Sequence, residues 1–350
     1  MLRLWVHGCS HVGTDLRHGR ESLADAIRHS ENEFEWDIAL HLGDFSGSET
    51  PPRDEEGGEV VRQLGALRAH RREDFYTLVG NHDASGADEP TQWWFKKWLD
   101  PTGERTEYSG VDRSRMRFPV DGTWERYAFR AGNLLFLVMG DRNDSGPPVG
   151  RGPWGGYPAG AVTGDTFAWW RRMVEANPDC IVVSAHHHML KETTVASGPW
   201  EGYIEDGRGA LQPRYHRYFA DGGPEGASYL YFVDGQPDAQ AFERYLAKHS
   251  SAIDLWLGGH THTNPDDCFG GRSHVERKWG TTFVNCAALS RHHGRSNVPM
   301  SRLFTFVAGS ADACVQCYLH TSDYAPQGWY APAERVARLS KPFRLGEHNG

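Results

Sequence analysis

The amino-acid sequence predicts an α/β protein in which short buried strands alternate with amphipathic helices. Two observations support this fold class. Apolar runs of strand length alternate with stretches in which apolar residues recur at helical spacing. Five strand-like runs also end in residues with metal-binding donor atoms: LRLWVHGCSH, DIALHLGDFSG, DFYTLVGNHDAS, CIVVSAHHHML and AIDLWLGGHTHTN. Because ligands of open α/β sheets bind outside the carboxyl ends of the strands, we expect these donors to form one site.

The first half of the chain predicts strands and helices in strict alternation. One helix is supported by Leu23, Ala26 and Ile27, which fall on one face, and another has Pro90 at its first position, where the missing N–H costs least. The polar residues 100–122 predict no regular structure. In order, we expect a strand at 3–7, a helix at 19–34, a strand at 37–42, a helix at 57–74, a strand at 74–79 and a helix at 90–99.

The second half opens with a predicted hairpin, because the Gly132–Asn133 pair between two apolar runs is a two-residue turn signal. The expected elements are strands at 126–131 and 134–139, a helix at 164–177, a strand at 180–185, a helix at 238–250 and strands at 252–258, 281–286, 302–307 and 313–319. Residues 191–237 form a long insertion. Without an internal repeat or a linker, we expect one domain over residues 1–320, followed by an extended C-terminal tail at 321–350.

Composition excludes several classes of protein. The formal net charge of -9 disfavours non-specific binding to nucleic acid or to a membrane surface. The longest apolar runs, such as LLFLVM, are far too short to span a bilayer. The first strand begins within a few residues of Met1 and leaves no room for a signal peptide, so we expect a cytoplasmic protein. Cys314 and Cys317 form a C-x-x-C without a second pair, and we expect two packed thiols.

The strand-end donors combine imidazole, carboxylate, carboxamide and thiol groups. The residues concerned are Cys9, His11, Asp44, Asn81, His186, His260 and His262. These are more ligands than one ion can use, so the sequence predicts two metal ions. Imidazole, carboxylate and amide oxygen suit zinc, manganese or iron.

The motifs GDF, GNHD, a strand ending in HH, and GHTH occur in this order, and the set resembles the calcineurin-like metallophosphoesterase family. Each motif is short, but the ordered set, with a strand before each member, is specific. It covers roughly residues 3–290. The resemblance implies a four-layer αββα sandwich of two mixed sheets flanked by helices. It also implies a dinuclear metal centre at the strand ends and hydrolysis of phosphate monoesters or diesters.

The resemblance further implies a role for each donor. The first metal would be bound by His11 and His262, the second by Asn81, His186 and His260, and both by Asp44. His82 would contact the phosphoryl oxygen or the leaving group without binding metal, and Asp83 would orient it. A carboxylate shared by two cations holds them about 3.5–4 Å apart.

This chain departs from the family at Cys9, which stands where the first motif has an aspartate. Thiolate is a soft ligand that prefers zinc or iron to manganese or magnesium. Three alternatives stay open. Cys9 binds a zinc or iron ion directly; or it is an uncoordinated thiol that leaves the first metal to His11, Asp44 and His262; or the first site is weak or empty.

The run of three histidines leaves a further ambiguity. The ligand in this motif is usually the first histidine of a pair, which favours His186, but a strand read one residue later gives His187. We expect His187 and His188 otherwise to line the substrate pocket. Arg291 and His292 follow the run TTFVNCAAL, where a cationic loop would suit a phosphate and a solvated basic turn is the alternative.

The predicted function is that of a metal-dependent phosphoesterase acting on a small organic phosphate, a diester in preference to a monoester, with a metal-bridging hydroxide as nucleophile. GDFSGSE lacks the GDxVDRG run of phosphoprotein phosphatases. Cyclic-nucleotide phosphodiesterase activity stays an alternative. Cys9 and the extra histidines motivate a rival, a dinuclear iron-containing enzyme of the same fold with non-phosphoesterase chemistry. The oligomeric state does not follow from the sequence.

Overall fold

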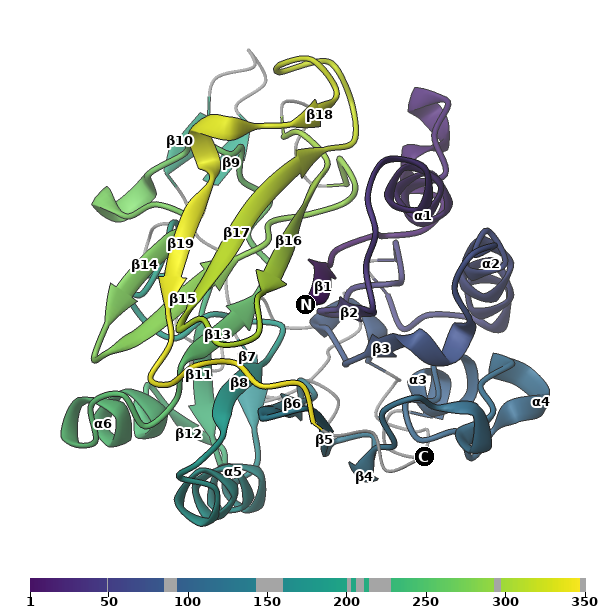
Figure 1. Ribbon diagram of the computed structural model, residues 1–350. Helices are drawn as coiled ribbons and strands as arrows, with labels where there is room; N and C mark the ends of the chain where they lie inside the picture. Colours follow the sequence, from purple (N-terminus) through teal and green to yellow (C-terminus); the bar gives the residue numbers. More distant parts are fainter. Residues whose placement is uncertain are drawn as a thin grey trace.

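Two mixed β-sheets pack face to face in the computed structural model of the protein, and helices cover their outer faces (Figure 1). The structure describes residues 1–48, 50–84, 93–142, 160–199, 203–205, 211–213, 228–292 and 297–346. The α/β fold class with two mixed sheets flanked by helices is confirmed.

The first sheet is built around β1, which pairs in parallel with β2 and antiparallel with β16. Successive side chains of a strand point to opposite faces, so Leu4 and Val6 of β1 face the second sheet while Trp5 faces the helices. Its strands are β1 (Leu2–His7), β2 (Ile38–His41), β3 (Phe75–Thr77), β16 (Met300–Phe306), β17 (Asp312–Leu319), β18 (Gly328–Trp329) and β19 (Arg335–Arg338).

The second sheet has three neighbouring parallel pairs at its centre, in which β8 lies between β6 and β13, and β13 between β8 and β15. Antiparallel strands complete both edges. Its strands are β4 (Asp121–Gly122), β5 (Arg126–Ala131), β6 (Leu134–Met139), β8 (Ile181–Ala185), β13 (Leu255–Gly258), β14 (Val275–Lys278) and β15 (Thr281–Asn285). The β5–β6 hairpin turns at Gly132, whose φ of 62° suits glycine.

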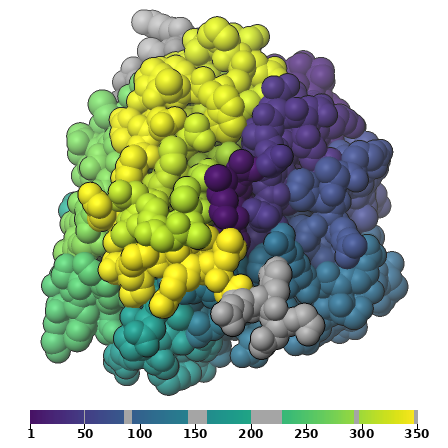
Figure 2. Space-filling model, viewed as in Figure 1, coloured from purple at the N-terminus to yellow at the C-terminus, as the bar shows by residue number. Residues whose placement is uncertain are grey.

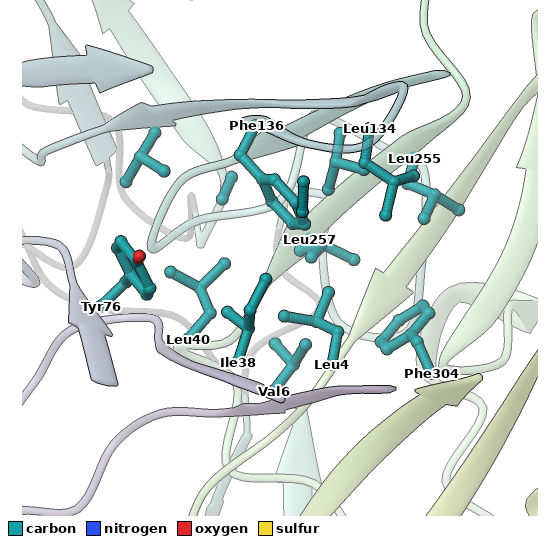
Figure 3. Close-up of a cluster of buried hydrophobic side chains, with 14 of the residues drawn as sticks. Leu4, Val6, Ile38, Leu40, Tyr76, Leu134, Phe136, Leu255, Leu257 and Phe304 are labelled. Carbon is teal, nitrogen blue, oxygen red and sulfur yellow. The ribbon is translucent and has the colours of Figure 1, made fainter. Parts of the chain in front are cut away.

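The core between the sheets fixes their relative position. Figure 3 shows aliphatic side chains of the two sheets meeting there, and all of those it labels are buried. Leu4, Val6, Ile38 and Leu40 come from the first sheet, and Leu134, Phe136, Leu255 and Leu257 from the second. Because interiors are close-packed, this layer also fixes the strand ends of one sheet relative to those of the other.

Helices α1 (Ser22–Glu33), α2 (Asp54–Leu64) and α3 (Trp93–Trp98) pack on the first sheet. Helices α5 (Gly164–Ala176) and α6 (Ala241–Lys248) pack on the second. Helix α2 begins and ends earlier than the predicted 57–74, because its acidic first turn favours the helix N-terminus and Gly65, a poor helix former, follows its last residue. A short helix, α4 (Thr106–Ser109), lies in the region predicted to be irregular.

Three-stranded and two-stranded sheets complete the described part of the fold. The three-stranded sheet contains β7 (Gly160–Val162), β11 (Leu230–Val233) and β12 (Gln236–Pro237). The two-stranded sheet contains β9 (Tyr203–Glu205) and β10 (Leu211–Pro213). Strands β9 to β12 lie within the predicted insertion at 191–237. Among the described residues, no helix combines the length and the apolar character that crossing a bilayer would require.

The C-terminal segment packs onto the sandwich. Strands β18 and β19 both pair with β17, and Ala337, Leu339 and Phe343 are buried in the core between the sheets. Figure 2 shows exposed parts of the C-terminal segment, in yellow, on the molecular surface. The division of the chain at residue 320 stays a prediction.

Candidate metal centre

The strand-end donors come together because the strands that carry them are parallel neighbours. β1, β2 and β3 lie side by side in parallel, with His7 in register with His41 and His41 with Thr77. β8 and β13 are parallel neighbours in the second sheet. Parallel strands end at the same edge, so the loops after all five strands converge there.

The first group of donors consists of Cys9, His11 and His262, all buried. The Nε2 atoms of His11 and His262 are 3.2 Å apart. Two ligand atoms on a tetrahedral zinc ion, each about 2.0–2.1 Å from the metal, are separated by about 3.3 Å. The pair therefore has the spacing of two ligands of one ion. The Oδ2 of Asp44 is 3.7 Å from the Nε2 of His11.

The second group contains His187, His188 and His260. The Nε2 of His187 is 3.1 Å from the Oδ2 of Asp44, and the Nδ1 of His260 is 3.1 Å from the Oδ1 of Asn81. Asp44 therefore lies next to both groups, and it also forms a third group with Cys9 and His187. A carboxylate shared by two ions would lie in this position.

His187, not His186, faces the bridging carboxylate. The Nδ1 of His187 donates to the carbonyl of Leu42 at 2.5 Å, so Nε2 is the ring nitrogen that faces Asp44. Burial lowers the pKa of His187, but the Asp44 carboxylate outweighs it and raises the pKa to about 9. Asp44 thus attracts positive charge to this position, which a metal cation would also satisfy.

His186 lies outside the donor groups found among the described residues. Its Nδ1 accepts the backbone N–H of His188 at 3.0 Å, and its Nε2 is 3.9 Å from the Oδ1 of Asp141. Asp141 is buried and follows β6, and its Oδ1 accepts the N–H of Ala161. The sequence prediction overlooked Asp141, although it follows an apolar strand as the other site residues do.

The ligand loops adopt strained backbone conformations. Four non-glycine candidates have positive φ: Cys9 (51°), His11 (39°), Asp44 (60°) and His260 (68°). Such conformations cost about 1–3 kcal/mol each and cluster at functional sites. The glycines of two motifs are required by close packing: a Cβ on Gly43 would lie 2.4 Å from the N of Gly80, and one on Gly80 would lie 2.2 Å from the Oδ1 of Asp44.

His82 lies against the first group. Its ring centroid is 4.8 Å from that of His11, and its backbone N–H donates to the Oδ1 of Asp44 at 2.8 Å. The Nδ1 of His82 is 2.8 Å from the carbonyl of Ser48. A carbonyl only accepts hydrogen bonds, so Nδ1 carries a proton and Nε2 is the nitrogen that can exchange one with substrate.

Asp83 has a different task from the predicted one. Its two oxygens accept the backbone N–H groups of Asp44, Phe45, Ser46 and Gly80, at 2.7–3.0 Å. It therefore fixes the Asp44 loop, while the Ser48 carbonyl orients the His82 ring. Burial, with a contribution from the Asp44 carboxylate, raises the pKa of Asp83 to about 7.

Arg291 and His292, although adjacent in sequence, contact different parts of the structure. The His292 ring stacks on that of His11, with 4.3 Å between centroids, and it forms a donor group with His11 and His82. The guanidinium of Arg291 pairs with Asp323 of the C-terminal segment. His292 is thus next to the centre, whereas Arg291 is neutralised by a carboxylate.

Cys9 is completely buried beside Asp44. Burial, and then the Asp44 carboxylate, raise the pKa of the Cys9 thiol well above its ordinary value. A coordinating cation reverses this effect, because it deprotonates a thiol outright. The position therefore supplies a negative donor only if a metal ion binds beside it.

A further layer of polar residues holds the ligand loops. The Nδ2 of Asn285 donates to the Oγ1 of Thr261 at 2.6 Å, next to His262 in sequence. The Nε2 of His41 is 3.0 Å from the Oγ of Ser10, and Ser10 lies between Cys9 and His11 in the sequence. Asn285 and His41 are strand-terminal polar residues like the ligands, and the sequence prediction gave neither of them a role.

The family model described as calcineurin-like phosphoesterase matches residues 2–264 of this chain. The chain belongs to the calcineurin-like phosphoesterase family. It is thus a phosphoric ester hydrolase by family, and its described residues contain candidate groups for the metal ions that this family binds.

Three solved structures are similar to this phosphoesterase at 9% sequence identity. A predicted phosphoesterase of Streptococcus pneumoniae TIGR4 has a TM-score of 0.34 and covers 96% of each chain. Chaetomium thermophilum Vps29 has a TM-score of 0.32 and covers 100% of this chain and 99% of its own. Haemophilus influenzae NAD nucleotidase (NadN) has a TM-score of 0.39 and covers 99% of this chain but only 51% of its own. A search of the curated proteins gave no match.

Proposed function

We propose that this protein is a dinuclear-metal phosphoesterase that hydrolyses a small organic phosphate, and a diester in preference to a monoester. The observation that carries the proposal is the position of Asp44 between two groups of donors. Its Oδ2 lies 3.7 Å from the Nε2 of His11 and 3.1 Å from the Nε2 of His187. The proposed ligands are Cys9, His11, Asp44 and His262 for the first ion, and Asp44, Asn81, His187 and His260 for the second.

The donors fit two such ions. The donor–donor spacings of 3.1–3.7 Å are those of neighbouring ligands, and the donor set is rich in nitrogen with one thiol. Two ions at this site would supply a hydroxide nucleophile near neutral pH and would offset the charge of the phosphate. Thiol and imidazole donors favour zinc or iron in the first site and admit manganese in the second.

The protein's own residues then position the substrate and move a proton. Asp44 holds the His82 backbone, and the Ser48 carbonyl fixes the His82 ring, so that Nε2 is available to protonate the leaving oxygen. His292, stacked on His11, can donate to a non-bridging phosphate oxygen.

The charge near the site favours a diester. Arg291, the one fixed cation among the predicted substrate contacts, is paired with Asp323. The proposed phosphate contacts are therefore the imidazoles of His82 and His292. These match the single negative charge of a diester better than the charge of about -1.5 to -2 on a monoester.

The test is metal analysis followed by assay with bis(p-nitrophenyl) phosphate and p-nitrophenyl phosphate. We expect two ions per chain and faster turnover of the diester. Asp44→Asn should lower metal content and remove activity, because it removes the shared charge. Two ions retained in Asp44→Asn would refute the bridging role, and iron without any esterase activity would favour the non-phosphoesterase rival. An assay with a cyclic nucleotide tests the alternative that the protein is a cyclic-nucleotide phosphodiesterase.

A further inference from the structure

We infer that His188 supplies a third imidazole to the second metal site, beside His187 and His260. The inference rests on the proposed dinuclear centre and deepens it. The family pattern assigns two histidines to this site, whereas this chain has a run of three at the end of β8.

The spacing of the three rings is close to that of ligands to one ion. One ring nitrogen from each of His187, His188 and His260 lies within 4.8 Å of the other two. The ring centroids are 4.9 Å apart for His187 and His188, 4.1 Å for His188 and His260, and 5.3 Å for His187 and His260. Two imidazoles bound to one ion at about 2.0–2.1 Å, with N–metal–N angles of about 90–110°, have centroids about 4.5–5.2 Å apart. His188 and His260, at 4.1 Å, would therefore move slightly apart on binding one ion.

The first site offers an internal reference for this spacing. His11 and His262, whose Nε2 atoms are 3.2 Å apart, have ring centroids separated by 5.1 Å. The two distances from His187, 4.9 Å and 5.3 Å, lie on either side of that value. His188 is therefore as close to His187 as two ligands of the first ion are to each other.

The position of His188 is fixed by its backbone hydrogen bonds and by the packing of its ring. The residue is completely buried, its N–H donates to the Nδ1 of His186, and its carbonyl accepts the Nε1–H of Trp256 at 3.3 Å. A Cβ on Gly160 would lie 2.7 Å from both Cγ and Nδ1 of His188, so glycine there leaves room for the ring. A backbone fixed by two hydrogen bonds and a ring packed against Gly160 are suited to a ligand.

Three imidazoles change the preference of the second site. With Asp44 and Asn81 they give a donor set with one carboxylate, which suits zinc, iron or cobalt and disfavours magnesium. His186 then serves the site indirectly, because its Nδ1 fixes the backbone of His188.

The experiment compares His188→Phe, which keeps an aromatic ring without a donor, with the matched control His186→Asn, whose amide oxygen can still accept the His188 N–H. Zinc is titrated into each metal-free protein in a competing chelator, and metal content and zinc X-ray absorption are measured. We expect His188→Phe to keep the first ion and to weaken the second by more than about 100-fold, beyond the 10–100-fold typical of residues that only support a ligand. The mean imidazole count per zinc should fall.

His186→Asn should retain both ions within about 10-fold of the wild-type affinity. A second ion held by His188→Phe within about 100-fold, or an unchanged imidazole count, would overturn the inference while leaving the dinuclear centre intact. If the phenylalanine does not fold, His188→Gln is titrated in its place with the same expectation. A wild-type protein that binds a single ion would overturn the proposed function, and this inference with it.

Discussion

Cys9 is where the chemistry of this chain differs most from its family pattern. Its sulfur lies in two donor groups, one with His11 and His262 and one with Asp44 and His187. A buried thiol in this position is costly to ionise, since burial and Asp44 both raise its pKa. A soft cation supplies the missing stabilisation, so the identity of this residue and that of the first metal ion are coupled.

Replacement of Cys9 tests this coupling. Cys9→Ser should weaken the first ion far more than the second, because a hydroxyl does not supply the thiolate charge. Cys9→Asp should retain two ions and shift the preference towards manganese, as carboxylate is the harder donor. Metal content after loading with equimolar zinc and manganese measures both effects. If Cys9→Ser keeps its metals and its activity, the thiol is only a packed side chain.

His82 provides a second test at the residue scale. His82→Ala should keep both ions and the fold, but its kcat should fall by a factor of roughly 10²–10⁴, the usual contribution of general acid–base catalysis. Metal analysis and steady-state kinetics check the prediction. Because Nε2 is expected to protonate the leaving group, a substrate with a better leaving group should lose less. Loss of a metal ion from His82→Ala would instead make His82 a ligand.

The residue types of the site were predictable from sequence, but the choice between neighbours was not. All proposed ligands follow apolar strands, which is visible in the sequence. Whether His186 or His187 faces Asp44 depends on one residue of strand register, and the hydrogen bond from His187 to Leu42 decides it. Leu42 is 145 positions away in the chain, so no local pattern contains that information.

At the scale of elements, the loops after β2 and β3 form one unit through Asp83. Its carboxylate joins the two loops by accepting N–H groups from both, and Gly43 packs on Gly80 at the same point. Adjacency in sequence to His82 suggested an orienting role, but the loop geometry turns the two side chains to different partners. Strands and helices were predictable from periodicity, whereas a hydrogen-bond network between loops was not.

Asp83→Asn is expected to destabilise these loops. The amide keeps one acceptor oxygen and directs N–H groups at backbone donors, so two of the four buried N–H groups lose their acceptor. At about 1–3 kcal/mol for each unsatisfied buried group, the free energy of unfolding should fall by about 2–6 kcal/mol. Urea unfolding of the metal-free protein measures the change. Asp121→Asn, on the exposed edge strand β4, is the control and should be neutral; equal stability of both variants would contradict the role of Asp83.

At the scale of the whole molecule, the site exists because two sheets are packed at a fixed offset. The first sheet supplies Cys9, His11, Asp44 and Asn81, and the second supplies the histidines that follow β8 and β13. Neither sheet holds all of the proposed ligands of either ion. The core between the sheets would therefore contribute to metal affinity, although it contains none of the proposed ligands.

The C-terminal segment is part of that core, which gives the last prediction. Phe343 is completely buried and lies 5.8 Å, between ring centroids, from Phe306 of β16. Phe343→Ala should lower the free energy of unfolding by about 3–5 kcal/mol, since it removes a large buried side chain and leaves a cavity.

Val336→Ala is the control: Val336 lies on nearby β19 but is 66% exposed, and surface changes are usually within about 0.5 kcal/mol. Urea unfolding of the metal-free variants gives both values. If Phe343→Ala is as stable as Val336→Ala, residues 321–350 form a dispensable tail; if the loss is as large as expected, the folded unit extends beyond residue 320.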